Sequence, residues 1–331
     1  MDERVLGRTE QPVSVIGLGT WQLGGDWGEV SDRDALSVLE AAVESGITFF
    51  DTADVYGDGR SEQLIGRFLA DNPDQLVTVA TKMGRRLEQV PENYVLQNFR
   101  AWTDRSRRNL AVDQLDLVQL HCPPSVVYSH DAVYDALDTL VADGAIAHYG
   151  VSVETCDEAL TAISRRGTAT VQIIINVFRM KPLEYVLPAA DSAGVGIIAR
   201  VPLASGLLSG RYTRETTFAP GDHRTYNRHG EAFDVGETFS GVDYQTGVAA
   251  AAEFTELVEE EFGAAVSPAQ VALAWIVNQP AVSTVIPGAR SVEQVRSNAA
   301  AGSLSPLRSE FLASLADLYD RMIRPSVHGR W

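Results

Sequence analysis

The chain has 331 residues, of which 45% are hydrophobic and 21% are charged, so it is long enough to bury the core of one large α/β domain or of two smaller domains. Its formal net charge is −17, and such a surface repels phosphate backbones and anionic lipids, which argues against nucleic-acid and membrane partners. Two cysteines are too few for a disulfide framework.

The chain begins with Met1, Asp2, Glu3 and Arg4, which do not resemble the apolar run of a signal peptide. No stretch approaches the ~18 uninterrupted apolar residues of a membrane-spanning helix. We therefore expect a cytoplasmic protein.

Short apolar runs alternate with longer amphipathic segments along almost the whole chain. The first run predicts a buried strand over 13–19, and Ser31 with an acid three residues later predicts the start of a helix that Gly46 ends. Further strands are predicted over 47–51, 76–82, 115–121, 147–152, 170–175, 196–201 and 282–286. Further helices are predicted over 61–70, 91–109, 131–142, 155–165, 183–193, 242–262, 268–278, 291–300 and 306–323.

Eight strands separated by helices predict a parallel sheet that is covered on both faces. A closed (β/α)8 TIM barrel fits this pattern better than an open sheet, with extra helices at the C-terminal end. No linker rich in Pro, Gly or Ser divides the chain, so we expect a single domain over 1–331. The segment 211–241 has little apolar pattern and follows the seventh strand, where long loops are typically lids or mobile segments.

A polar or glycine residue ends each predicted strand. In barrels of this class the active site lies at the carboxyl ends of the strands, so these residues should gather at one rim. In chain order they are Gly19 with Thr20 and Trp21, Asp51 with Tyr56 beyond it, Lys82, His121, Ser152, Gln172, Arg200 and Gly288.

Lys82 directly follows an apolar run, and a buried ammonium needs a partner, which Asp51 can supply from the neighbouring strand. Reducing a carbonyl requires a hydride and a proton. A phenol has an ordinary pKa near ~10, and a nearby cation such as Lys82 would lower the pKa of Tyr56. His121 could donate a hydrogen bond to the substrate oxygen and align it. These four residues predict a carbonyl reductase in which Tyr56 donates the proton.

With these residues in these positions, the chain resembles the aldo-keto reductase superfamily, including its members that are similar to potassium-channel β subunits. The resemblance rests first on Phe49-Phe50-Asp51-Thr52-Ala53-Asp54-Val55-Tyr56-Gly57. Other matching segments are Ser61-Glu62, Thr81-Lys82, Leu120-His121, 150–152, 172–176, 202–210 and 286–290. The resemblance implies a (β/α)8 barrel, the catalytic residues Asp51, Tyr56, Lys82 and His121, and NADPH as cofactor, with NADH also possible.

The resemblance also implies a set of cofactor contacts along the rim. Ser152 and Gln172 would bind the nicotinamide carboxamide, and Arg200, where many members have an aromatic residue, would stack on the ring. Arg290 would bind the adenosine phosphate, with Gln294 and Asn298 on the adenine side. The remaining implied contacts are Gly19, Thr20, Trp21, Asp51, Pro202, Leu203, Ser205, Leu207, Gly210, Ile286 and Gly288.

The substrate is expected to be a small carbonyl compound or sugar in a pocket that includes Trp21, Trp27, Tyr56 and His121. No His-x-His follows the first strand, so no metal is expected. Two alternatives stay open: oxidation of alcohols or sugars in the reverse direction, and a cofactor-binding regulatory subunit similar to potassium-channel β subunits. The sequence leaves the oligomeric state open.

Overall fold

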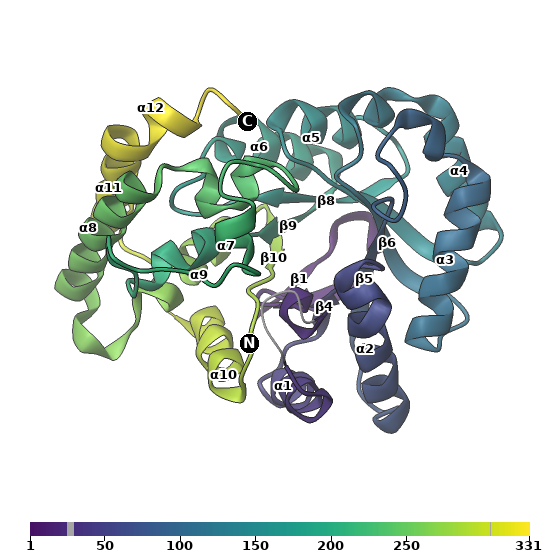
Figure 1. Ribbon diagram of the computed structural model, residues 1–331, viewed down its shortest axis with the longest axis horizontal. Helices are drawn as coiled ribbons and strands as arrows, with labels where there is room; N and C mark the ends of the chain where they lie inside the picture. The colour runs from purple at the N-terminus through teal and green to yellow at the C-terminus, as the bar shows by residue number, and fades with distance from the viewer. Residues whose placement is uncertain (25–29, 305) are drawn as a thin grey trace.

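The computed structural model describes residues 1–24, 30–304 and 306–331 (Figure 1). Within these residues, eight strands form one sheet in the order β3 to β10, and each pair of neighbours is parallel. The strands are β3 (Leu18–Gly19), β4 (Phe49–Asp51), β5 (Thr78–Met83), β6 (Leu115–His121), β7 (Ile146–Ser152), β8 (Thr168–Ile174), β9 (Gly196–Arg200) and β10 (Val282–Val285).

The two outer strands of this sheet meet and close the barrel. Parallel bridges join Ile16 to Val285 and Gly19 to Gly288. The Gly17 amide donates to the Val285 carbonyl at 2.8 Å, and the Gly19 amide donates to the Pro287 carbonyl at 3.0 Å. A Cβ atom at Gly19 would lie only 3.0 Å from the carbonyl oxygen of Ile286, so glycine permits this close approach. The predicted closed barrel is confirmed.

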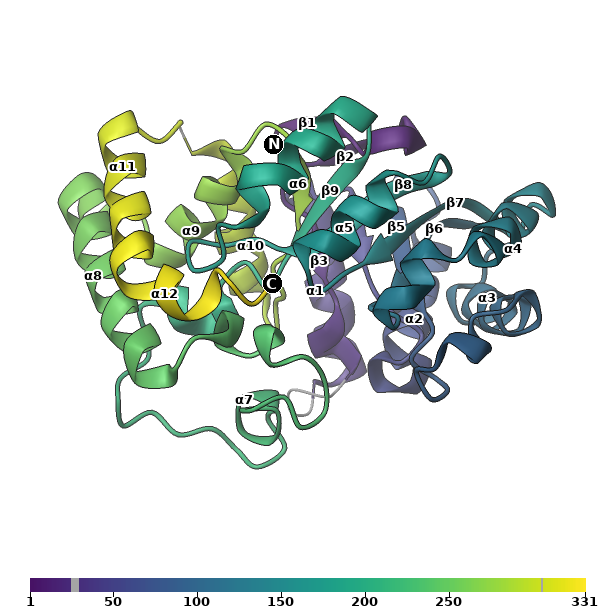
Figure 2. The same cartoon turned by 90° about the horizontal axis from the view of Figure 1, so that it is seen from above.

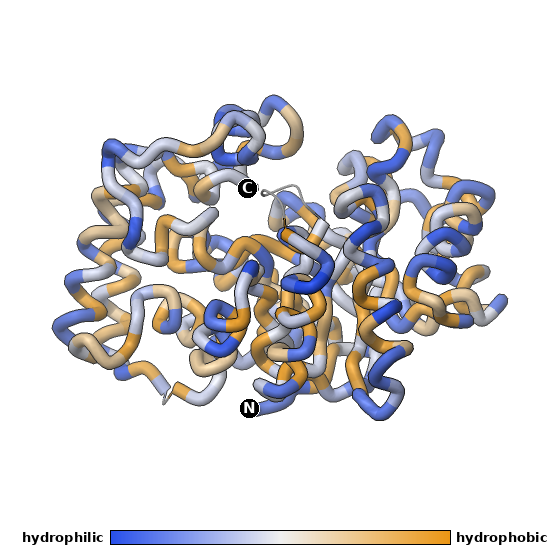
Figure 3. The backbone as a smooth tube through the Cα atoms, turned by 60° about the horizontal axis from the view of Figure 1, so that its bottom comes forward, coloured by the Kyte–Doolittle hydropathy of each residue, from blue (hydrophilic) through white to orange (hydrophobic). Residues whose placement is uncertain are grey.

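Helices surround the barrel, as Figures 1 and 2 show from two directions. They are α1 (Asp32–Glu44), α2 (Arg60–Asp71), α3 (Leu96–Leu110), α4 (Asp131–Ala142), α5 (Cys156–Ile163), α6 (Pro182–Ala193), α8 (Tyr244–Phe262), α9 (Pro268–Val277), α10 (Val292–Ala300), α11 (Ser309–Leu318) and α12 (Arg324–Val327). Hydrophobic residues concentrate along the central strands, and the outer helices alternate between hydrophobic and hydrophilic positions (Figure 3). Among the described residues, no helix is both long and apolar enough to cross a membrane.

An antiparallel hairpin of β1 (Glu3–Val5) and β2 (Pro12–Ser14) precedes the barrel. Leu6 and Val13 from this hairpin pack with Phe49, Leu117 and Ile198, which are fully buried barrel residues. The predicted strand over 13–19 is therefore divided between the hairpin and β3. The Ser14 hydroxyl donates to the Ile16 carbonyl at 2.7 Å, so a side chain supplies a bond that a continuous strand would take from its neighbour.

The segment 211–241 lies at the end of the barrel opposite to the hairpin, as the position of α7 (His223–Tyr226) shows in Figure 2. It also contains the 3-10 helices η7 (Val235–Glu237) and η8 (Phe239–Gly241). The Trp331 indole donates to Asp234 at 2.9 Å and lies 3.8 Å from the Arg179 guanidinium. Side-chain contacts therefore hold this segment over the carboxyl ends of the strands.

Candidate active site

The barrel gathers Asp51, Tyr56, Lys82 and His121 at the carboxyl ends of three adjacent strands. Asp51 ends β4, Lys82 is the last residue but one of β5, and His121 ends β6. Beyond β4 the ladder continues, because the amides of Thr52 and Asp54 donate to β5 carbonyls at 2.8 and 3.1 Å. This pairing directs the chain back across the rim, so the 3-10 helix η3 (Tyr56–Gly59) places Tyr56 beside Lys82.

The Lys82 ammonium lies at the centre of this group and is only 1% exposed. Its Nζ lies 2.5 Å from Asp51 Oδ1, 2.8 Å from the Thr52 carbonyl oxygen and 3.3 Å from the Tyr56 hydroxyl. An ammonium has three N–H donors, and each of these three oxygens can accept one. The burial of the charge is therefore compensated by one carboxylate and a full set of hydrogen bonds.

Two buried amide side chains fix the other oxygen of Asp51. Gln172 donates to Asp51 Oδ2 at 2.7 Å from β8, and Gln119 donates to the same oxygen at 3.3 Å from β6. Gln172 thus supports the carboxylate that holds Lys82, and its expected contact with the nicotinamide carboxamide stays a prediction. Gln119 is a part of the site that the sequence analysis missed, because it lies within the strand and not at its end.

Burial in the site shifts the pKa values of Tyr56 and His121 in opposite directions. Burial raises the pKa of the Tyr56 phenol above its ordinary value, while the Lys82 charge acts in the opposite direction. Burial acts to lower the pKa of Lys82, but Asp51 and Tyr56 outweigh it and keep the ammonium charged. Burial, together with the charges of Arg85, Lys82 and Arg200, holds the pKa of His121 well below its ordinary value. At neutral pH Tyr56 is therefore a protonated phenol and His121 a neutral imidazole.

An aromatic wall stands beside Tyr56. Trp21, in the 3-10 helix η2 (Trp21–Gly24), stacks on Tyr56 with 6.0 Å between ring centroids and 22° between planes. His223 and Phe233 of the 211–241 segment contact the same indole at 5.3 and 5.9 Å. Trp21 is thus placed where a substrate wall was expected, while Trp27 lies outside the described residues.

The turn after β9 contains Pro202, Leu203, Ser205, Leu207 and Gly210, which were expected along a pyrophosphate channel. It includes the 3-10 helix η6 (Ala204–Ser209), with left-handed backbone at Ala204, Ser205 and Gly206. The Ser205 hydroxyl donates to the Glu237 carbonyl at 3.1 Å and accepts from the Phe239 amide at 3.0 Å. In this structure Ser205 therefore anchors the 211–241 segment to the barrel.

Three residues expected at the adenosine end, Arg290, Gln294 and Asn298, lie in α10 or directly before it. The Arg290 amide donates to the Gln294 side chain at 2.7 Å, and the Asn298 side chain donates to the Gly288 carbonyl at 3.3 Å. A Cβ atom at Gly288 would lie 2.1 Å from the side chain of Gln22. Among the described residues, the buried amide oxygen of Gln22 has no hydrogen-bond partner.

This end of the barrel suits an anionic nucleotide. The Arg290 side chain is exposed and charged, and the amino end of α10 adds a favourable dipole and backbone donors. Of the remaining residues on this side, Ile286 is buried beside the strand that closes the barrel, and the Thr20 hydroxyl donates to the Asp51 carbonyl at 2.9 Å. Ser152 is buried at the end of β7.

A second charged group lies next to the first, and of its members the sequence analysis named only Arg200. The Arg200 guanidinium lies 2.9 Å from Glu154 and 3.3 Å from Glu237, and the Arg85 guanidinium lies 3.4 Å from Glu237. Arg85 and Glu154 follow strand ends by two residues, a position that could have drawn attention to them. Glu237 carries no comparable signal, because its segment has no periodicity.

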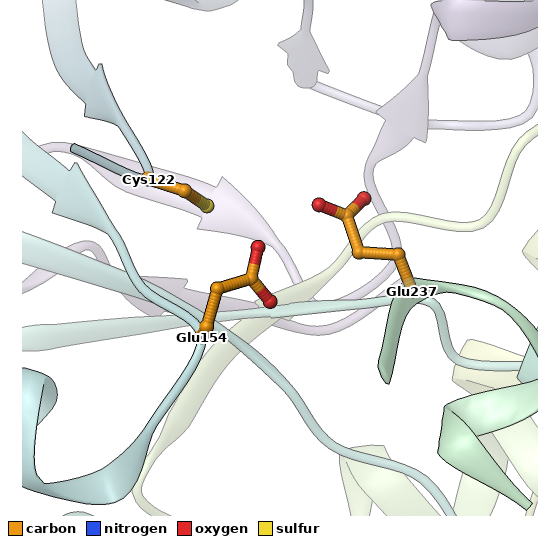
Figure 4. Close-up of side chains that lie close together, drawn as sticks. All are labelled: Cys122, Glu154 and Glu237. Atoms are coloured by element: carbon orange, nitrogen blue, oxygen red, sulfur yellow. The ribbon is translucent and has the colours of Figure 1, made fainter. Parts of the chain in front are cut away.

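Cys122 completes this neighbourhood, and Figure 4 shows its thiol with the carboxylates of Glu154 and Glu237. One ligand atom from each of the three lies within 4.8 Å of the others, which is close enough for a metal site. Burial raises the pKa of the Cys122 thiol to about 12, so the thiolate that a metal would need is disfavoured. Both carboxylates are also paired with arginines. The set is better described as an ion-pair cluster.

The sequence model of the Aldo/keto reductase family matches residues 15–320. An oxidoreductase of Mycobacterium tuberculosis is 32% identical over 326 residues, which are 96% of this chain and 93% of that protein. The chain belongs to the aldo/keto reductase family. The carbonyl–alcohol oxidoreduction expected from the strand-end residues therefore agrees with the family to which they belong.

Other relatives of this aldo/keto reductase cover nearly all of its length. A rice protein named "probable voltage-gated potassium channel subunit beta" is 29% identical over 93% of both chains. The glycerol dehydrogenase structure from Gluconobacter oxydans has a TM-score of 0.78 and 29% identity, and it covers 97% of this chain and 95% of its own. An aldo-keto reductase from Klebsiella pneumoniae in complex with NADPH has a TM-score of 0.71 and 25% identity over 96% of both chains.

Proposed function

We propose that this aldo/keto reductase uses NADPH to reduce aldehydes or ketones to alcohols, with Tyr56 as the proton donor. The observation that carries the proposal is the placement of the Lys82 ammonium between Asp51, at 2.5 Å, and the Tyr56 hydroxyl, at 3.3 Å. Such a cation stabilises the phenolate that remains after the proton has left. The family membership of the chain supports the same chemistry.

Each residue of the site has one task in this reaction. The neutral imidazole of His121 donates a hydrogen bond to the carbonyl oxygen and aligns it beside the Tyr56 hydroxyl. The hydride for the carbonyl carbon would come from NADPH when it is bound. Tyr56 donates its proton to the oxygen, and Lys82 stabilises the resulting phenolate while Asp51 holds Lys82 in place. In the reverse direction the Tyr56 phenolate accepts the proton of an alcohol, so the same residues serve oxidation.

The residues that would hold NADPH lie along one rim of the barrel. Ser152, Gln172 and the plane of Arg200 would contact the nicotinamide, the turn after β9 would contact the pyrophosphate, and α10 with Arg290 would bind the adenosine phosphate. The NADPH complex of the Klebsiella relative supports NADPH as the cofactor, and the individual contacts are part of the proposal. NADH would occupy the same surface without the contact between its missing phosphate and Arg290.

The experiment that tests the proposed function is a screen for NADPH oxidation by the purified chain over aldehydes, ketones, quinones and sugars. We expect turnover of at least one class at ordinary enzymatic rates, about 1 s⁻¹ or more. The competing proposal is a regulatory subunit that binds cofactor and acts through a partner, which the similarity to the rice protein favours. Tight binding of NADPH with no turnover of any carbonyl would support that alternative.

Arg290→Ala is expected to remove most of the preference of the chain for NADPH over NADH. The guanidinium is permanently charged and forked, so it suits a phosphate, and one charge-assisted contact predicts a preference of about tenfold to a hundredfold. The variant should raise KM for NADPH and spare KM for NADH, measured with one saturating carbonyl substrate. The net charge of −17 opposes the more anionic cofactor, but distant charges are screened beyond ~8 Å.

Arg296→Ala is the matched control, because Arg296 is an exposed arginine of α10, the helix that Arg290 precedes, and it pairs with Glu44 at 3.4 Å. It should keep the NADPH preference of the parent. An Arg290→Ala variant with an undiminished preference, or a parent that prefers NADH, would show that Arg290 does not read the phosphate.

A further inference from the structure

Arg85 and Arg200 form ion pairs with the carboxylate of Glu237 from two sides. Arg85 Nη2 lies 3.4 Å from Glu237 Oε1, and Arg200 Nη1 lies 3.3 Å from Glu237 Oε2. Each oxygen of the carboxylate thus faces its own guanidinium. The side chains of Arg200 and Glu237 are only 8% and 12% exposed, so this contact is largely removed from water. Two-point binding by arginine is the geometry by which proteins recognise carboxylates.

This carboxylate lies beside the reacting groups. Arg85 Nε donates to the backbone carbonyl of His121 at 3.1 Å, and Arg200 ends β9 on the same rim. The charges of Arg85 and Arg200 both act on His121, and the charge of Glu237 acts on Tyr56. A group bound between the two arginines would therefore be a near neighbour of a carbonyl held by Tyr56 and His121.

The cluster contains a second carboxylate, and the two arrive from different parts of the fold. Glu154 lies two residues after the end of β7 and 2.9 Å from Arg200, whereas Glu237 belongs to η7 in the 211–241 segment. Figure 4 shows their carboxyl groups extending toward each other from these two places. Glu154 is fixed to the barrel frame, while Glu237 reaches the cluster from outside it.

The charge balance of the cluster depends on Glu237. Two guanidinium groups face two carboxylates: Glu154 lies 2.9 Å from Arg200 and 3.8 Å from Arg85, and Glu237 lies between the same two arginines. If Glu237 withdraws with its segment, the buried Arg200 and the half-buried Arg85 are left with Glu154 alone. An uncompensated buried charge is costly, so the opened cluster would favour a replacement anion. A single carboxylate restores the balance, whereas a phosphate dianion would exceed it.

We propose that the substrate of this reductase is an aldehyde or ketone that carries a carboxylate, and that this carboxylate takes the place of Glu237 on Arg85 and Arg200. The proposal rests on the proposed function and adds a substrate class to it. The Glu237 side chain then fills the anion site when no substrate is bound. If the cluster only fastened the 211–241 segment, the chain would not distinguish charged from neutral carbonyl compounds.

The experiment compares two aldehydes of the same shape, para-carboxybenzaldehyde and para-carbamoylbenzaldehyde, with NADPH and the full chain. The acid should have a kcat/KM about 10- to 100-fold above that of the amide, as expected for a two-point charge-assisted contact. In Arg85→Gln this ratio should fall to about one, mainly through KM for the acid. Equal kcat/KM values for the two aldehydes in the unmodified chain would overturn the proposal.

Two further variants separate substrate recognition from simple fastening of the segment. Arg86→Gln is the control, because Arg86 is the next residue and pairs with the exposed Asp58 at 2.7 Å; it should keep the ratio of the unmodified chain. Glu237→Gln removes the internal competitor, so it should lower KM for the acid more than KM for the amide. A Glu237→Gln variant that changes both KM values equally would indicate a fastening role and overturn the proposal.

The same protein variants also test the anion site if neither aldehyde is reduced. That result would count against the proposed function, and calorimetry with benzoate and benzamide on the NADP⁺-loaded protein would then test the anion site alone. Benzoate binding that weakens in Arg85→Gln supports the site. Absence of benzoate binding, or equal binding of benzamide, overturns it.

Discussion

Tyr56→Phe is expected to lower kcat for carbonyl reduction about 10²–10⁴-fold while NADPH still binds. The substitution removes the only atom that donates the proton and leaves the ring, and with it the stacking on Trp21, in place. The loss should appear in kcat because the proton is transferred in the transition state and not on substrate binding. Cofactor binding can be measured separately, by the quenching of tryptophan fluorescence on titration with NADPH.

Tyr149→Phe is a suitable control for this prediction. Tyr149 is a buried barrel tyrosine whose hydroxyl donates to Asp138 at 2.7 Å, away from the site. It should keep its turnover and lose only the stability of one hydrogen bond, about 1 kcal/mol. Retention of most activity in Tyr56→Phe would exclude Tyr56 as the proton donor.

Lys82→Met is expected to reduce kcat by about 10²-fold or more and to move the pH dependence of alcohol oxidation toward alkaline pH. The Lys82 charge opposes the rise that burial causes in the pKa of Tyr56, so its removal lets that pKa climb further. Oxidation requires the phenolate, which forms only above this pKa. The alkaline rise in kcat for an alcohol substrate should therefore begin at a higher pH in the variant.

The Lys82 variant should also be less stable, because Asp51 would remain buried without its cation. Breaking a buried ion pair by removing one partner costs roughly 3–5 kcal/mol of folding stability. The thermal unfolding of the variant should therefore be measured together with its kinetics. Asp51→Asn should act in the same sense but more mildly, since Asn can still accept from Lys82 and the substrate contacts stay in place. An unchanged pH profile with full activity in Lys82→Met would mean that Lys82 only supports the fold.

The residues at the strand ends could be predicted from the sequence because strands that follow one another in the chain are neighbours in the barrel. β6 (Leu115–His121) and α4 (Asp131–Ala142) have the predicted bounds, since each has strong periodicity and clear flanking signals. Because parallel strands deliver their carboxyl ends to one rim, an acid, a lysine and a histidine at successive strand ends were sufficient to predict the contacts around Lys82.

Other features depend on contacts that local patterns do not encode. The hairpin strands β1 and β2 have three residues each, too few for a periodicity to show. The predicted helix over 306–323 instead begins at Ser309 and changes to a π-helix at Tyr319–Ile323. Arg85 and Glu237 are 152 positions apart, and Glu237 lies in a segment without pattern, so only the folded chain brings them together.

The most direct measurement follows a labelled hydride. The chain would be incubated with benzaldehyde and NADPH in which deuterium replaces both hydrogens at the reactive carbon of the nicotinamide ring, and the benzyl alcohol would be analysed by mass spectrometry. We expect one deuterium on the alcohol carbon with the unmodified chain, and little labelled alcohol with Tyr56→Phe. Unlabelled alcohol, or NADPH that binds and is not oxidised by any carbonyl compound, would contradict reduction by hydride transfer at Tyr56.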